Sequence, residues 1–256
     1  EIYLLDVDIE NKCELAFEMF KKASEKGDTL AQYNLATMYL TEPSIENNYQ
    51  ETIRLFKLAA AKEHINSMVN LATMYFKGTG IEQNFEEAIK WYIKAANLND
   101  RDSQYLLGCI YHSGSILIRD YQKALHWFEL ESKHKDSKSL YKLALMYLNG
   151  QGIEINNIKA IYYLQQAAEK RDPDALNDLG EIYLEGKIIE KDIPLSIAYF
   201  KLGSGLGNIK SHYNLGTAYY LKRNIPENRA LNLKEAFRLY TLGADKGNID
   251  SLNNLA

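Results

Sequence analysis

Several features that mark specialised protein classes are scarce or missing in this sequence. Its 256 residues include 2 Cys and 4 Pro, which excludes a disulfide-stapled scaffold, a cysteine-based zinc module and a proline-rich linker. No apolar run approaches the roughly 18–20 residues that a membrane helix requires, so no membrane insertion is expected. The formal net charge is −4, whereas binding along a nucleic-acid backbone needs a basic surface. No nucleic-acid partner is therefore expected.

The sequence does contain an internal repeat with a step of 36 residues. A leucine recurs at this step, and a tyrosine, called here the core tyrosine, follows it four residues later. The leucines are Leu35, Leu71, Leu107, Leu143, Leu179 and Leu215, and the tyrosines are Tyr39, Tyr75, Tyr111, Tyr147, Tyr183 and Tyr219. Small residues stand four before and one after each leucine, and this spacing places all four positions on one helix face. Each repeat is therefore expected to begin with a packed helix, helix A.

A second helix, helix B, is expected to follow helix A in each repeat. Its packed face combines bulky residues with a small pair, as in Trp91, Tyr92, Ala95 and Ala96. The last helix B is displaced by 40 residues instead of 36, so four extra residues are expected between Lys222 and Leu231.

Residues that favour helix ends recur at the same step. The side chains of Asp and Asn cap free amides at helix starts. Before helix A stand Asp28, Asp100, Asp136, Asp172, Asn208 and Asn248, with His64 as the exception. Before helix B stand Asn48, Asn84, Asp120, Asn156, Asp192 and Asn232. Glycines mark helix ends, where a left-handed residue is often required: Gly78, Gly114, Gly150 and Gly186 after helix A, and Gly27, Gly207 and Gly247 after helix B. The core and the caps thus predict the same boundaries.

These boundaries predict an all-α, right-handed α-α superhelical solenoid of about seven antiparallel helix pairs, forming a single domain over residues 1–256. Tyr3 lies one step before Tyr39, so the chain is expected to open on the tail of a helix A. It has no initiator Met and stops inside another helix A at Ala256. We therefore expect it to be part of a longer protein.

The repeat resembles the Sel-one-like repeat, a relative of the tetratricopeptide repeat. The resemblance rests on the segments 67–81 and 84–96 and on the Gly-x-Gly between the helices, Gly78/Gly80 and Gly150/Gly152. Two units depart from the pattern: Thr41-Glu42-Pro43-Ser44 has no glycine, and Glu131-Ser132 replaces an Ala-Ala pair. We expect these departures to change local loop shape.

The resemblance implies a non-enzymatic scaffold or adaptor for protein–protein interaction, such as a bacterial host-interaction or signalling adaptor or a eukaryotic quality-control adaptor. The alternative that it implies is a small-molecule or cell-wall ligand binder, or an enzyme, of the type of the cysteine-rich bacterial relatives.

No set of residues for catalysis or metal binding stands out. The glycines Gly78 and Gly80 lack the preceding strand and the flanking pattern of a nucleotide-binding loop. Cys109 and His112 share a helix face, but a metal site needs about four ligands. We therefore expect no catalytic residue, no cofactor and no metal. Cys13 and Cys109 lie more than two repeats apart, too far for a disulfide, and two free thiols favour a cytoplasmic location.

A partner is expected on the concave side of the solenoid, which helix A lines. The groove positions are the two residues before each core leucine, the second residue after it and the fifth residue after it. The candidate partner-binding residues at these positions are Tyr33, Asn34, Thr37, Asn70, Thr73, Phe76, Tyr105, Cys109, His112, Tyr141, Asn177, Tyr213, Asn214, Thr217 and Tyr220. Asn amides can pair with a peptide backbone and Tyr offers a rigid apolar surface, so a protein or peptide partner is predicted. The alternative is that the same residues serve packing between repeats.

Overall fold

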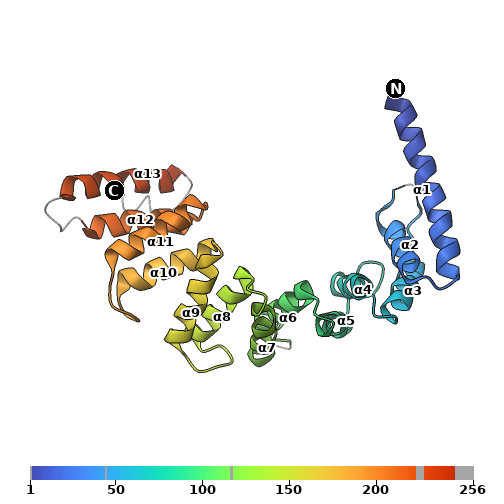
Figure 1. Ribbon diagram of the computed structural model, residues 1–256, viewed down its shortest axis with the longest axis horizontal. Coiled ribbons are helices and arrows are strands. Elements are labelled where there is room, and N and C mark those ends of the chain that lie inside the picture. Colours follow the sequence, from blue (N-terminus) through green and yellow to red (C-terminus); the bar gives the residue numbers. More distant parts are fainter. Residues whose placement is uncertain (1, 44, 116–117, 223–227, 246–256) are drawn as a thin grey trace. The chain divides into compact units, whose positions relative to one another are not determined.

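A computed structural model of the chain describes residues 2–43, 45–115, 118–222 and 228–245, with the backbone alone for residues 2–11. These residues form thirteen α-helices and no strand (Figure 1). The helices are α1 (Ile2–Glu25), α2 (Thr29–Thr41), α3 (Tyr49–Ala60), α4 (Ile65–Lys77), α5 (Phe85–Asn97), α6 (Arg101–Ser113), α7 (Tyr121–Ser132), α8 (Ser137–Asn149), α9 (Asn157–Glu169), α10 (Pro173–Glu185), α11 (Ile193–Gly205), α12 (Ile209–Lys222) and α13 (Arg229–Asp245). The predicted all-α fold of helix pairs is confirmed. From α2 onward, the even-numbered helices are helix A and the odd-numbered helices are helix B.

The chain divides into two compact units, Glu1–Cys109 and Ile110–Ala256, with the boundary inside α6. The expectation of a single domain over the whole chain stays a prediction.

The first helix differs from the prediction. Instead of the tail of a helix A followed by a separate helix B, α1 runs without a break from Ile2 to Glu25. The physical reason is that this segment contains neither Gly nor Pro, the two residues that most strongly end a helix.

The caps of helix A follow the prediction, and His64 takes the same role as the acids. Asp28 accepts a hydrogen bond from the Ala31 N–H at 2.7 Å, which satisfies one of the free amides of the first turn. In the next repeat, His64 Nδ1 accepts from the Ser67 N–H at 3.3 Å. The position is therefore a helix cap in this repeat too, with an imidazole nitrogen in place of a carboxylate.

The caps of helix B are confirmed at five of the six predicted positions. Each side chain accepts from the N–H three residues further on, at 2.9–3.0 Å: Asn48, Asn84, Asp120, Asn156 and Asp192. The prediction for Asn232 is wrong, because α13 begins earlier, at Arg229. Arg, Ala and Leu, the three residues before Asn232, are strong helix formers, so the longer connection extends the helix. Gly247 and Asn248 lie outside the described residues, as does part of the stretch predicted to hold the insertion.

The turn from helix B to the next helix A is one motif repeated along the chain. One residue in it is left-handed in each of the six turns that the structure describes, at Gly27, Glu63, Asn99, Lys135, Arg171 and Gly207. The following N–H commonly bonds back to a carbonyl five residues earlier, as Asp28 does to Ala23 at 3.1 Å, which is the Schellman pattern. Four of these six positions carry a side chain in a conformation that glycine adopts more easily.

The glycines after helix A have two different roles. Gly78, Gly150 and Gly186 are left-handed C-caps, as predicted. The prediction of a left-handed residue at Gly114 is wrong, because its φ is not positive. A Cβ at Gly114 would lie 2.4 Å from the Ile110 carbonyl oxygen, so close approach of the backbone requires glycine there.

The second glycine of each Gly-x-Gly leaves room for a tyrosine that begins the preceding helix B. A Cβ at Gly80 would lie 2.2 Å from the Tyr49 ring, and a Cβ at Gly152 would lie 2.7 Å from Tyr121. These glycines therefore allow one repeat to pack closely against the next.

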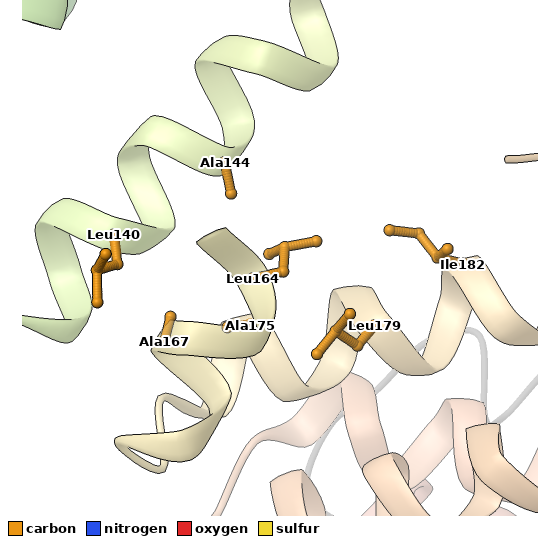
Figure 2. Close-up of a cluster of buried hydrophobic side chains, with 7 residues drawn as sticks. All are labelled: Leu140, Ala144, Leu164, Ala167, Ala175, Leu179 and Ile182. Atoms are coloured by element: carbon orange, nitrogen blue, oxygen red, sulfur yellow. The ribbon is translucent and has the colours of Figure 1, made fainter. Parts of the chain in front are cut away.

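The core is built from the faces that the repeat predicts. In the second unit, Figure 2 shows side chains of α8, α9 and α10 converging on one cluster: Leu140, Ala144, Leu164, Ala167, Ala175, Leu179 and Ile182. Burying one such leucine stabilises the fold by about 1.5–3 kcal/mol. Core tyrosines extend the packing, since Tyr147 stacks on Tyr163 at 5.6 Å and Tyr183 on Tyr199 at 5.8 Å between ring centroids.

Candidate functional site

The threonines at the groove positions are bonded within the chain. Thr37, Thr73 and Thr217 each donate to the carbonyl four residues earlier in their own helix, at 2.9–3.3 Å. Thr73 Oγ1 also lies 3.0 Å from the Tyr92 hydroxyl. The same contact recurs between Thr217 and Tyr240 at 3.1 Å. The hydroxyls of Thr73 and Thr217 thus serve packing of helix A on helix B.

A polar network joins the groove positions of α8, α10 and α12 in the second unit. The Tyr141 hydroxyl donates to Asp178 Oδ2 at 2.9 Å. Asn177, which is 2% exposed, donates to Glu181 at 3.0 Å and accepts from the Asn214 amide at 2.9 Å. Both links join residues 37 apart on successive A helices, so they hold one repeat to the next.

Burial changes the acid–base behaviour of this network. It raises the pKa of Asp178, and the hydrogen bonds from Tyr141 and Asn177, which act in the opposite direction, do not fully offset it. The pKa of Tyr141 is also raised, first by burial and then by the neighbouring Asp178 carboxylate. The hydroxyl therefore stays protonated and remains the donor to Asp178.

The aromatic residues at the groove positions are also partly engaged. The Tyr33 ring lies 4.7 Å from the His64 ring and 6.1 Å from Phe56. Tyr213 lies 5.9 Å from Tyr240. These contacts fix the rings of both groove tyrosines against helix B or the adjacent turn.

One turn further along helix A, Phe76 and His112 each lie against the first residue of the following helix B. Phe76 meets the edge of Phe85 at 5.3 Å. His112 bonds through Nε2 to Gln151 Oε1 at 2.9 Å and lies against the Tyr121 ring. Tyr220 has 43% of its surface exposed.

Three candidates carry a polar group that makes no hydrogen bond within the described part of the chain. The side-chain amides of Asn34 and Asn70 are half-buried, and neither makes a hydrogen bond to any residue in the described part of the chain. The Tyr33 hydroxyl likewise bonds to none of these residues. Tyr105 and Cys109, by contrast, are half-buried on α6 and are engaged in contacts of their own.

Sequence reasoning missed Asp178 and Gln151 as members of these contacts. Asp178 occupies the second groove position of its repeat, the position that Asn34 and Lys142 occupy in theirs. The register alone could therefore have identified it. Gln151 lies in a loop, and nothing in the sequence signals its bond with His112.

Cys13 and Cys109 are half-buried and are not joined in a disulfide, and Cys13 Sγ lies 3.9 Å from a Glu42 carboxylate oxygen. Within the described residues, no group of three or more His, Cys, Asp or Glu side chains could hold a metal ion. No helix in that same part of the chain is long and apolar enough to cross a membrane.

Comparison with solved structures places the fold among bacterial repeat proteins. A protective antigen of uropathogenic Escherichia coli with an SLR fold is 27% identical, with a TM-score of 0.81 over 93% of this chain and 50% of the antigen. The chain thus spans half the length of that antigen. A Sel1 repeat protein from Oxalobacter formigenes is 26% identical, with a TM-score of 0.65 over 94% of this chain and 99% of that protein.

A more distant likeness shows the fold alone. The C-terminal part of a TPR repeat-containing protein from Cytophaga hutchinsonii is 16% identical, with a TM-score of 0.57 and full coverage of both chains. No curated protein sequence matches this chain.

The family profile of the Sel1 repeat matches seven consecutive segments, at residues 2–28, 29–64, 65–100, 101–130, 137–172, 173–208 and 209–248. The last segment is longer than the others, as the displaced helix B predicts. The fourth stops just before Glu131, where the Ala-Ala pair is replaced. Because these segments cover nearly the whole sequence, the chain belongs to the Sel1 repeat family.

Proposed function

We propose that this chain is a non-enzymatic scaffold that binds a protein or peptide partner along the concave helix A face, with Asn34 and Asn70 as polar anchors. Repeats of the Sel1 and tetratricopeptide type generally serve as protein–protein interaction scaffolds and are generally not enzymes. The observation that carries the proposal is that these two amides, one repeat apart, have no partner among the described residues. Their counterparts Asp178 and Asn214 are bonded within the chain.

The chemistry of the two amides suits an extended peptide. Each Asn side chain offers both a donor and an acceptor, which is the pairing that a peptide backbone needs. A half-buried amide without a partner costs free energy relative to one that is bonded, so a bound backbone would stabilise the complex. The Tyr33 ring, held by His64, adds a rigid surface that loses little entropy on binding.

The contacts described above narrow the set of partner-binding residues. Thr73, Tyr141, Asn177, Asn214 and Thr217 hold helices together, so we assign them to packing. The proposed contact residues are Tyr33, Asn34, Asn70 and Phe76 in the first unit and, separately, Tyr220 in the second unit.

The partner proposed is a protein and not a nucleic acid, because a net charge of −4 is unfavourable for binding along a nucleic-acid backbone. The similarity to a protective antigen of uropathogenic bacteria supports a role as a bacterial host-interaction or signalling adaptor.

The test is capture of a partner from the native extract with three purified proteins: the wild type, an amide variant (Asn34→Ala with Asn70→Ala) and a control variant (Asn97→Ala with Asn149→Ala). The control asparagines are exposed at the ends of α5 and α8. Circular dichroism and urea unfolding establish that all three are folded.

We expect wild type and control to retain the same partner and the amide variant to lose it. With the partner identified, its affinity for the amide variant should be about tenfold lower, as expected for two lost hydrogen bonds of roughly 0.5–1.5 kcal/mol each. Equal capture by the amide variant, or no partner for any protein, would contradict the proposal.

A further inference from the structure

The loop between α2 and α3 is built differently from the other loops that join helix A to helix B. In four of those loops the cap of helix B donates its N–H to the core tyrosine carbonyl at 2.9 Å: Asn84 to Tyr75, Asp120 to Tyr111, Asn156 to Tyr147 and Asp192 to Tyr183. Asn48 and Tyr39 are both described and make no such bond. α2 ends on an extended Glu42 and not on a left-handed glycine. This loop therefore lacks the hydrogen bond that ties the other four loops to the helix A before them.

A cavity of about 680 Å³ opens where that loop stands away, inside the first unit. One wall is aromatic, because Phe17 of α1 and Tyr39 of α2 line it and their rings meet edge to face at 5.3 Å. The other walls are Glu14 and Glu18 of α1 and residues 45–48 of the loop. The cavity thus combines an apolar surface with a polar rim.

The rim carries charge of one sign. Glu14, Glu18 and Glu46 contribute three carboxylates, and no lysine or arginine is among the described residues that line the cavity. Later repeats place a base at the register position of Glu18: Arg54, then Lys90. Each of those bases pairs with an acid in its own helix. The first repeat therefore carries an acid where the next two repeats carry a base.

Core tyrosines elsewhere in the chain show what their rings accept. A lysine ammonium lies 5.1–5.9 Å from the ring centroid in four pairs: Lys57 and Tyr75, Lys123 and Tyr111, Lys159 and Tyr147, and Lys201 and Tyr219. Such contacts contribute about 0.5–1 kcal/mol at exposed sites. Among the described residues, no lysine or arginine lies over the ring of Tyr39. Arg54, whose pKa is raised mainly by its hydrogen bond with Glu51 and least by Tyr39, is bound by Glu51 at 2.6 and 2.8 Å.

We propose that this cavity binds an arginine side chain of a partner protein, with the guanidinium between Glu14, Glu18 and Glu46, its flat face on the Tyr39 ring and its edge toward the Phe17 ring. Arginine fits better than a metal ion, because the aromatic wall suits a planar, weakly hydrated cation and supplies no ligands. The site does not include Asn34 or Asn70, so it stands independently of the function proposed above.

The test uses the whole chain and a fluorescently labelled peptide, Gly-Ser-Arg-Gly-Arg-Ser, whose binding is followed by anisotropy. A second peptide replaces both arginines with citrulline, which keeps the shape and removes the charge. The cavity variant carries Glu14→Gln, Glu18→Gln and Glu46→Gln. We expect saturable binding of the arginine peptide to the wild type, and about tenfold weaker binding both of the citrulline peptide and by the cavity variant.

A matched control separates the cavity from overall charge. Glu82→Gln, Glu86→Gln and Glu154→Gln remove the same three charges from exposed positions, and this variant should bind within about twofold of the wild type. A further variant, Phe17→Leu, keeps an apolar side chain and should bind a few-fold more weakly while its urea unfolding establishes that it is folded.

Three results would overturn the proposal: no saturable binding of the arginine peptide, equal binding of the citrulline peptide, or equal loss in the cavity and control variants. The Asn34→Ala/Asn70→Ala variant should bind the arginine peptide like the wild type, so failure of one proposal is distinguishable from failure of the other.

Discussion

The hydroxyl of Thr73 on helix A lies 3.0 Å from the hydroxyl of Tyr92 on helix B, and the last helix pair repeats this contact with Thr217 and Tyr240. Tyr92 is 5% exposed, so its hydroxyl has little access to water. In the repeat before, Thr37 stands at the same register position and Phe56 at that of Tyr92. The hydroxyl pair is therefore a matched feature of particular repeats.

This pair predicts a specific pattern of stabilities. Thr73→Val leaves the Tyr92 hydroxyl without its partner and should lower the free energy of unfolding by about 1–2 kcal/mol. The double variant Thr73→Val/Tyr92→Phe removes both polar groups and should be closer to the wild type than the sum of the single changes. Urea unfolding of the four proteins measures the coupling. Thr37→Val is the control, and a loss there as large as that of Thr73→Val would refute the pairing.

The glycines of the Gly-x-Gly loops predict a second effect. Gly80→Ala forces a side chain onto a residue with φ of 67° and a Cβ 2.2 Å from the Tyr49 ring. It should lower the free energy of unfolding by about 2–4 kcal/mol through backbone strain and overpacking, as measured by urea unfolding.

The chain supplies a matched control for this change. Gly205 ends α11 and has no heavy atom within 4 Å of a built Cβ, so Gly205→Ala should be neutral or stabilising by up to about 1 kcal/mol. If Gly80→Ala is tolerated as well as Gly205→Ala, glycine is not needed to seat Tyr49.

The repeat step made most of the fold predictable because caps and packed faces are local properties. Helix starts at Asp28 or Asn84 need only neighbouring amides. Gly114 shows the limit, since glycine in a sequence does not reveal whether it serves a left-handed φ or a close contact. α1 shows another limit of the sequence-based prediction. The repeat register predicts a break between two helices there, but a register does not itself end a helix.

The candidate site was less predictable because it depends on side chains one repeat away. Tyr141 and Asp178 bond across repeats, whereas Tyr33 and Asn70, in the same register, do not. A carboxylate is a stronger acceptor than an amide, and the Tyr33 ring is held against His64. The sequence shows which residues share a register, and the structure shows which of them are bonded.

The left-handed turn residues predict a gain in stability. Arg171 has a φ of 61° in a turn where other repeats have Gly27 or Gly207, and a left-handed non-glycine residue costs about 1–2 kcal/mol. Arg171→Gly should therefore raise the free energy of unfolding by about 0.5–1 kcal/mol, after the larger entropy of the unfolded glycine chain is subtracted. Lys170→Gly, one residue earlier with a φ of −86°, is the control and should not stabilise. Thermal or urea unfolding distinguishes the two.

Asp178 predicts a pH dependence of stability. Its pKa in the folded chain is raised above the ordinary value of 3.8, chiefly by burial, so folding takes up a proton in the window between the unfolded and folded pKa. The contribution of Asp178 is fully present below the unfolded pKa and is lost as the pH rises through the folded pKa. Lowering the pH from 7 into this window should therefore stabilise the wild type relative to Asp178→Asn, which cannot titrate.

Urea unfolding of both proteins at several pH values between 7 and 4 measures this difference directly, because all other titrating groups are shared. If the wild type instead loses stability relative to Asp178→Asn as the pH falls, the hydrogen bonds from Tyr141 and Asn177 hold the carboxylate ionised more strongly than burial opposes it. The network joining α8, α10 and α12 would then depend on a charged centre, and acid would loosen it where the raised pKa predicts that acid tightens it.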